Sequence, residues 1–86
     1  MALRYLVVVE KAEHNYGAYA PDVPGCITTG GTLEETLRNM REALTGHLEL
    51  LRADGDPLPL PVTQHLQTPD ASDTISYVDV DLPQAS

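Results

Sequence analysis

The segment that most constrains this chain spans residues 16–35 and reads as strand, rigid turn, strand and helix start. Pro21 and Pro24 fix φ and remove two backbone donors, so neither can continue a central ladder of hydrogen bonds. Gly25 can supply a positive φ, and Asp22 can accept hydrogen bonds from the backbone that follows it. The segment is therefore predicted to contain a tight turn between two short strands.

Four strands are predicted from the distribution of apolar and β-branched residues. The first is expected to be central, because its apolar run is uninterrupted, as is typical of a strand covered on both faces. Apolar and polar residues alternate in the last strand, which indicates one buried and one exposed face. The predicted strands are Leu3–Glu10, Tyr16–Ala20, Cys26–Thr29 and Thr74–Leu82.

A single long helix is predicted after the third strand. Thr32 is a favourable N-cap, and Glu35, three residues later, completes a capping box. Asp54–Pro57 supplies residues that end a helix, with a glycine able to take the left-handed conformation. Apolar residues recur at spacings of three and four and form one stripe, which consists of Leu33, Leu37, Met40, Leu44, Leu48 and Leu51.

The element order β-β-β-α-β predicts an α+β fold in a single domain, residues 1–86. If the last strand lies beside the first and the helix forms a parallel crossover, the sheet is mixed and has the order 3-2-1-4. One helix covers only one face of the central strand. Either the proline-rich segment 57–61 or a second copy of the chain would cover the other, and we expect a homo-oligomer, a dimer or tetramer.

Charge and composition restrict the possible partners. The chain has 13 acidic and 5 basic residues and a formal net charge of -8, which argues against direct nucleic-acid binding and favours a basic partner protein. Cys26 is the single cysteine, so an internal disulfide is excluded. No apolar run is long enough for a signal peptide or a membrane span. We therefore expect a cytoplasmic protein that does not bind membranes.

Acidic residues on the last strand suggest one possible chemistry. Asp79 and Asp81 share a face of that strand and could hold a metal together with Glu10 or Asp22, as in a ribonuclease-H-like nuclease. A role in protecting an edge strand against aggregation explains Asp79 and Asp81 better than a metal site does. We predict no catalytic residue and no metal site here.

The other reactive side chains also favour structural roles. The three histidines lack the spacing of a zinc site, and Cys26 is best explained as a small buried side chain. Gly30 and Gly31 precede a helix but lack the lysine of a phosphate-binding loop, so a tight turn with positive φ explains them better. No cofactor is expected.

The stretch Tyr16–Leu44 resembles the signature of HicB-like antitoxins. In that family a strand enters a Pro-Asp-x-Pro-Gly-Cys turn, followed by a Thr/Gly stretch and a Thr-x-x-Glu helix start. The valine-rich strand before it and the Gly-Asp-Pro-Leu-Pro segment after the helix are similar too. The resemblance implies a partial ribonuclease-H-like fold and a type II antitoxin that performs no catalysis. Such an antitoxin binds a HicA-type, mRNA-cleaving toxin and occludes its active histidine.

Many members of that family append a DNA-binding domain. This chain ends at Ser86, just after the last predicted strand. We therefore expect a solitary member of the family that lacks this domain. Its absence and the negative charge of the chain argue against regulation of its own operon through DNA, and the sequence leaves that question open.

Occlusion of a toxin requires an exposed surface, which we expect on the double-proline turn and on the last strand. Tyrosine suits such a surface because its ring is large and its tip is polar. Two alternatives remain, a minimal metal-dependent nuclease using Glu10, Asp79 and Asp81, and a homo-oligomeric binding or structural protein without a toxin. The candidate partner-binding residues are Tyr19, Pro21, Asp22, Val23, Pro24, Gly25, Tyr77 and Asp79.

Overall fold

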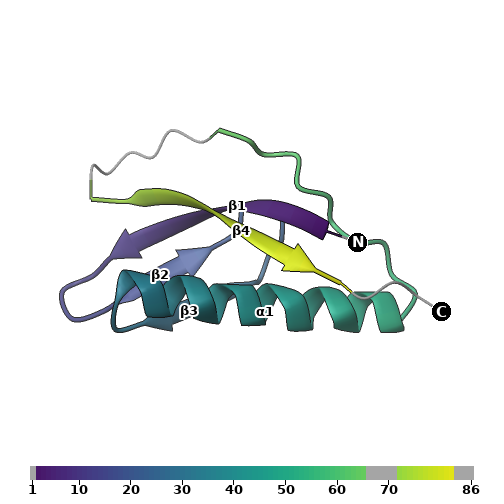
Figure 1. The fold of residues 1–86 in the computed structure, drawn as a ribbon, viewed down its shortest axis with the longest axis horizontal. Helices are drawn as coiled ribbons and strands as arrows, with labels where there is room; N and C mark the ends of the chain where they lie inside the picture. The colour runs from purple at the N-terminus through teal and green to yellow at the C-terminus, as the bar shows by residue number, and fades with distance from the viewer. Residues whose placement is uncertain (1, 66–71, 83–86) are drawn as a thin grey trace.

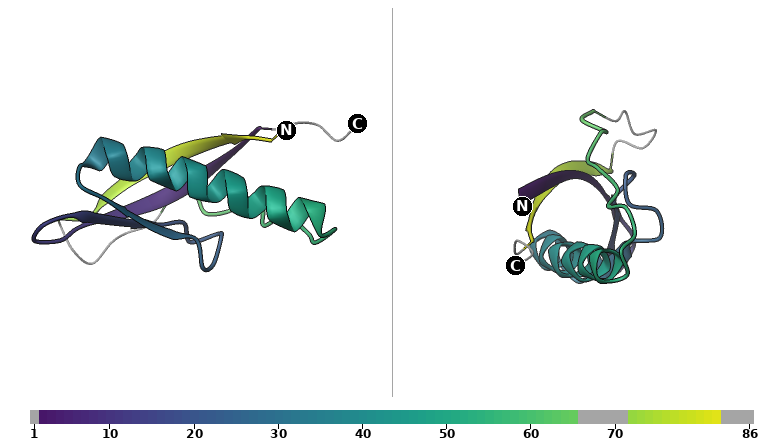
Figure 2. Two further views of the ribbon diagram at one scale, coloured as in Figure 1. Left: turned by 90° about the horizontal axis from the view of Figure 1, so that it is seen from below. Right: turned by 90° about the vertical axis from the view of Figure 1, so that its right-hand side faces the viewer.

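The computed structural model, which describes residues 2–65 and 72–82, shows a four-stranded sheet that curls partly around one long helix (Figures 1 and 2). The strand order is β3-β2-β1-β4, which confirms the predicted order and the position of the helix on one face. The elements are β1 (Ala2–Lys11), β2 (Tyr16–Tyr19), β3 (Ile27–Gly30), α1 (Leu33–Ala53) and β4 (Thr74–Asp81).

The direction of β4 differs from the prediction. All three pairs of neighbouring strands are antiparallel, so the sheet is not mixed. The helix does not act as a parallel crossover, because the chain leaves its C-terminal end and runs back along the sheet through residues 55–65 before β4 begins (Figure 1). β4 therefore starts at the end of the sheet where α1 also starts, and it runs in the same direction as α1.

β1 is the centre of the fold, as predicted from its uninterrupted apolar run. Five consecutive residues, Tyr5–Val9, are at most 1% exposed. Tyr5, Val7 and Val9 face α1 and belong to the main core. This core also contains Ala18, Ala20, Val23, Cys26, Met40, Leu44, Leu48, Val78, Val80 and Leu82.

Leu6 and Val8 point to the other face of the sheet and are buried within a single chain. Residues 57–65, which we call the strap, pass from the end of α1 to this face (Figure 2, right). The Tyr77 hydroxyl, which lies on the same face as Leu6, donates to the Gln64 carbonyl oxygen at 2.8 Å. Of the two covers considered, the chain thus supplies its own, and our expectation that a second copy covers this face is wrong.

Both ends of α1 are capped as the sequence indicates. The Thr32 hydroxyl accepts a hydrogen bond from the Glu35 amide at 3.0 Å, and a Glu35 carboxylate oxygen accepts one from the Gly31 amide at 3.4 Å. Gly55 has φ 76°, and the amides of Gly55 and Asp56 donate to carbonyls of the last turn, which is a Schellman motif. Within the described residues, no helix combines the length and the apolar character that crossing a lipid bilayer requires.

Gly30 permits a close contact between the sheet and the start of α1. Neither Gly30 nor Gly31 has a positive φ, so the positive-φ explanation of this pair is wrong. A Cβ on Gly30 would lie 2.5 Å from Oγ1 and 2.7 Å from the amide nitrogen of Thr36. Thr36 is fully buried, and its hydroxyl donates to the Thr32 carbonyl at 2.7 Å. The predicted apolar stripe omitted this residue because threonine gives no hydrophobic signal.

The Gly30→Ala substitution should destabilise the fold, because backbone atoms of Thr36 cannot move away as a flexible side chain can. We expect a loss of about 1–3 kcal/mol in the free energy of unfolding, measured by urea denaturation. Gly46→Ala is the matched control, since nothing lies within 4 Å of its added methyl group. It should stabilise the helix by about 0.5–1 kcal/mol. Equal urea midpoints for Gly30→Ala and the wild type would contradict this role of Gly30.

Candidate partner-binding surface

The double-proline segment forms the predicted tight turn between β2 and β3, and it does so as two consecutive hydrogen-bonded turns. The Val23 amide donates to the Ala20 carbonyl at 3.1 Å, and the Cys26 amide donates to the Val23 carbonyl at 3.2 Å. In the second turn Pro24 is followed by Gly25 at φ 85°, the residue pattern of a type II turn. The chain therefore holds this loop in shape without help from a partner.

The turn has a buried side and an exposed side. Val23 is 1% exposed and belongs to the core, so it is not available to a partner in this structure. Cys26 is buried beside it, and burial raises the pKa of its thiol, which supports the predicted structural role. Pro21 is half-buried, while Pro24 and Gly25 are exposed. Only part of the predicted contact set therefore lies on the surface.

Asp22 ties the turn to the strap. Its two carboxylate oxygens accept hydrogen bonds from the Thr63 amide at 2.8 Å and the Thr63 hydroxyl at 2.6 Å, across 41 residues of sequence. The Tyr5 hydroxyl holds the strap from the core side by donating to the Pro59 carbonyl. Burial and, secondarily, the charge of Asp22 raise the pKa of Tyr5, so its phenol retains the proton that it donates. The strap is thus fixed at both ends of its path.

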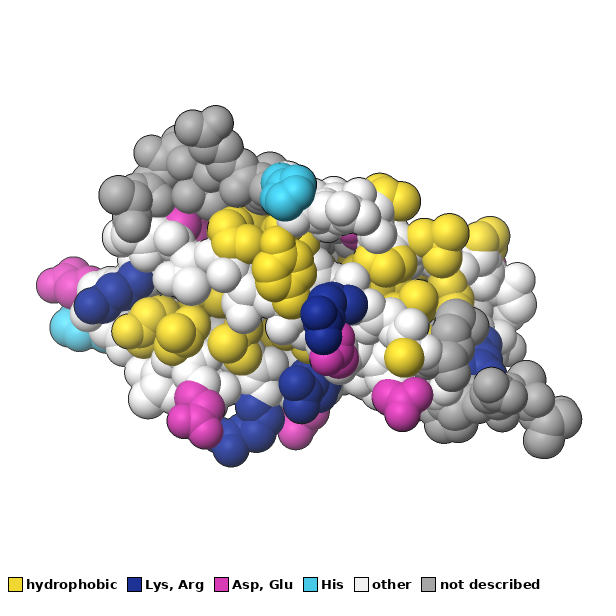
Figure 3. Space-filling view, turned by 45° about the horizontal axis from the view of Figure 1, so that its top comes forward, with side chains coloured by type: hydrophobic (Ala, Val, Ile, Leu, Met, Phe, Trp, Pro, Cys, Tyr) yellow, Lys and Arg dark blue, Asp and Glu magenta, His cyan; other side chains and the backbone are white. Residues whose placement is uncertain are grey.

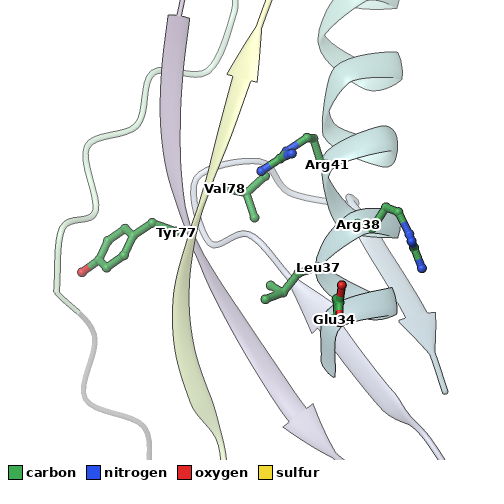
Figure 4. Close-up of a pocket in the computed structure, with 6 residues that line it drawn as sticks. All are labelled: Glu34, Leu37, Arg38, Arg41, Tyr77 and Val78. Atoms are coloured by element: carbon green, nitrogen blue, oxygen red, sulfur yellow. The ribbon is translucent and has the colours of Figure 1, made fainter. Parts of the chain in front are cut away.

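Tyr19 and Tyr77 lie on the face of the sheet opposite α1, which we call the outer face. Tyr19 is paired with Val8 on one side and Ile27 on the other, and Tyr77 is paired with Leu6. Directly paired residues of antiparallel strands point to the same face. Figure 4 shows Tyr77 directed away from α1. The two tyrosines singled out from the sequence therefore share one surface.

Large apolar side chains are exposed on the outer face and on the strap. Ile27 of β3 is 70% exposed and Tyr77 of β4 is 49% exposed, while Leu60 and Val62 of the strap are 62% and 75% exposed. Figure 3 shows hydrophobic side chains at several places on one face, with acidic and basic side chains between them. Ile27, Leu60 and Val62 were absent from the sequence-based set because their exposure depends on register and on the path of the strap.

Asp79 is engaged within the chain. The Arg4 guanidinium donates to its two carboxylate oxygens at 2.7 and 3.2 Å. The hydrogen bond to Arg4 holds the pKa of Asp79 below its usual value, and the charge of Arg41 contributes to the shift. Both members of the pair are well exposed, so the pair adds little to stability. The ion pair does fix the position of the Asp79 carboxylate.

The carboxylates proposed for a nuclease do not converge. Asp79 is paired with Arg4 near the start of β1, whereas Glu10 is paired with Gly17 near its other end. Six residues of strand separate the two positions, which corresponds to about 20 Å. Among residues 2–65 and 72–82, no group of three or more metal-ligating side chains forms. The geometry therefore gives no support to a nuclease built on Glu10, Asp79 and Asp81.

Comparison with known proteins fits this arrangement. The protein-family model described as "HicB_like antitoxin of bacterial toxin-antitoxin system" matches residues 5–86. The chain belongs to this family. A solved structure of the N-terminal domain of the Burkholderia pseudomallei antitoxin HicB is similar, with 30% identity and a TM-score of 0.79 over 93% of this chain and all of that one. A chain from the HicA3 and HicB3 toxin-antitoxin complex has 27% identity and a TM-score of 0.76, again over 93% of this chain and all of that one.

Similar sequences include two proteins that are longer than this chain. A 14.9 kDa protein from the rep-hol intergenic region of Haemophilus phage HP1 is 40% identical over 81 residues, which is 91% of this chain and 61% of the phage protein. The antitoxin HicB 1 of Photorhabdus laumondii is 36% identical over 98% of this chain and 49% of its own length. The chain thus spans about half to three fifths of the length of these two relatives.

The Asp22→Ala substitution should release the strap from the turn, because Thr63 loses both acceptors. We expect the free energy of unfolding to fall by about 1–3 kcal/mol and the Thr63 amide to exchange its hydrogen faster. Asp56→Ala is the control, since it removes an exposed carboxylate beyond α1. Unchanged protection of the Thr63 amide in Asp22→Ala would show that the strap is held by other contacts.

Proposed function

We propose that this chain is the antitoxin of a type II toxin-antitoxin system and neutralises a HicA-type, mRNA-cleaving toxin by binding it, without catalysis. Membership of the HicB-like family and the likeness to a chain of a HicA-HicB complex support this function. The likeness covers the N-terminal domain of HicB. The proposal therefore concerns the binding function of this domain.

The proposed toxin-binding surface is the outer face of the sheet together with the exposed side of the double-proline turn and the strap. Exposed apolar side chains at its centre can be buried by a partner, which is the main source of binding energy in such interfaces. Tyr19, Pro21, Pro24, Gly25 and Tyr77 remain proposed contacts. The surface gains its apolar anchors from Ile27, Leu60 and Val62.

Two of the residues predicted as contacts act indirectly in this proposal. Val23 lies in the core and sets the shape of the turn, and Asp22 holds the strap through Thr63. Asp79, paired with Arg4, borders the surface. Removing Asp22 would therefore weaken toxin binding by displacing the strap rather than by removing a direct contact.

Electrostatics favours the same partner. A toxin that cleaves mRNA must attract a polyanion, and a chain with a net charge of -8 is attracted to such a basic surface. The same charge opposes direct binding of nucleic acid. The proposed location is the cytoplasm, where mRNA and an unpaired thiol such as that of Cys26 are both expected.

Self-association belongs to the proposal as well. The strap already covers the face of β1 that gave the sequence-based reason for it. The outer edge of β4, which pairs with no other described strand, gives a different reason to propose self-association.

Co-expression tests the antitoxin function most simply. The gene beside the one for this chain should encode a small basic HicA-like protein, and the two products should co-purify and relieve growth arrest by the toxin. Absence of such a reading frame, or failure of the pair to co-purify, would refute the function.

Ile27→Asp should weaken toxin binding about tenfold or more, since losing an anchor at the centre of an interface costs about 2 kcal/mol and about 1.4 kcal/mol is a factor of ten. Isothermal titration calorimetry with the purified toxin measures the effect. Leu50→Asp is the matched control, because Leu50 is 62% exposed but lies on α1. An equal loss of affinity in both variants would place the interface elsewhere.

A further inference from the structure

The strap and the outer face of the sheet form the walls of a pocket of about 370 Å³. Two of the lining residues come from strands β1 and β4, and the other four belong to the strap. Figure 4 shows the Tyr77 side chain extending from β4 towards the strap. A pocket of this volume can hold one large side chain of a partner protein. Its lining consists of Arg4, Pro61, Thr63, Gln64, His65 and Tyr77.

Hydrogen bonds within the chain fix the two walls of this pocket relative to each other. The Asp22 carboxylate accepts two hydrogen bonds from Thr63, at 2.8 and 2.6 Å. The Tyr77 hydroxyl donates to the Gln64 carbonyl oxygen at 2.8 Å and so joins β4 to the strap. A side chain that enters the pocket therefore meets a preformed site, and little conformational entropy is lost in ordering the walls.

Arg4 determines the charge of the pocket. It is the only Lys or Arg among the six lining residues, and none of the six is Asp or Glu. Its Nε and Nη2 atoms donate to the Asp79 carboxylate at 2.7 and 3.2 Å. A guanidinium has five N–H donors, so the two donors on Nη1 can bind a second carboxylate.

We propose that this pocket receives an acidic side chain of the toxin, whose carboxylate pairs with Arg4. The inference rests on the proposed function for the identity of the partner. The methylene groups of a glutamate would lie against the apolar parts of the lining, the Tyr77 ring and Pro61. The side chains of Gln64 and His65 can supply further donors to the carboxylate.

A basic side chain is the alternative occupant, because the chain as a whole is acidic. It would pair with Asp79, which is bonded to Arg4 at the border of the surface. Asp79 is not among the lining residues, however, whereas Arg4 is. Arg4 would repel a cation in the pocket and attract a carboxylate. The lining therefore favours an acidic side chain.

Such a pocket would give specificity that net charge cannot provide. A net charge of -8 attracts basic proteins in general. A carboxylate placed to reach Arg4 is a local feature that a basic protein can have or lack. A basic protein without it would leave the pocket unfilled and bind more weakly. Arg4 is thus the specificity-determining residue of this proposal.

Two variants that neutralise opposite members of the Arg4–Asp79 pair test the proposal by calorimetry with the purified toxin. Arg4→Met should bind about tenfold more weakly, because it removes the charge and keeps an apolar stem. Asp79→Asn should bind more tightly, because an uncharged amide no longer competes for Arg4. Both variants should fold, since the exposed pair adds little to stability. Unchanged binding by Arg4→Met, or weaker binding by Asp79→Asn, would overturn the proposal.

Arg52→Met and Asp56→Asn are the matched controls. They make the same two changes in net charge, in the last turn of α1 and just beyond the helix. Each should bind the toxin as the wild type does. Effects as large as those of the pocket variants would show that net charge controls the affinity, and they too would overturn the proposal.

A small probe separates failure of the pocket from failure of the antitoxin function. N-acetylglutamate with an amidated α-carboxyl group should shift the NMR signals of Gln64, His65 and Tyr77 in the wild type but not in Arg4→Met. The uncharged glutamine derivative has the same shape and should shift them less, and the arginine derivative represents the basic alternative.

No response to the glutamate probe, or a stronger response to the arginine probe, would overturn the proposal whether or not the toxin binds. If the wild type binds the glutamate probe but not the toxin, the antitoxin function fails and the pocket remains a carboxylate site.

Discussion

The burial of β1 on both faces is the constraint on which the rest of this structure depends. Every side chain of Tyr5–Val9 is at most 1% exposed, so each face of the strand has a cover. α1 provides one through Met40, Leu44 and Leu48. The strap lies on the other face, and its path across the sheet explains why the connection between α1 and β4 is long.

The strap also links the fold to its proposed function. Asp22 fixes it beside the double-proline turn, and Tyr77 fixes it above the outer face. The apolar residues Leu60 and Val62 are thereby held in place on the surface. A partner that binds them meets a prearranged surface and loses less conformational entropy on ordering it. The double-proline turn is thus a part of the fold that also shapes a recognition surface.

Local signals in the sequence were sufficient for much of this architecture. The apolar run of β1, the cap at Thr32 and the glycine at position 55 each act within a few residues, and each was confirmed. The direction of β4, the role of Gly30 and the bond between Asp22 and Thr63 depend on residues far apart in sequence. Nothing in the spacing of those residues indicates such contacts, so they could be recognised only from the structure. For the same reason Val23 was expected at the surface, although the turn directs it into the core.

In the proposed complex the outer face and the strap, rather than α1, bind the toxin. Hydrogen exchange of the chain can be measured with and without the purified HicA-like protein encoded beside its gene. We expect slower exchange of residues 19–27 and 59–64 in the complex, with exchange in α1 unchanged. Slower exchange confined to the exposed face of α1 would contradict it.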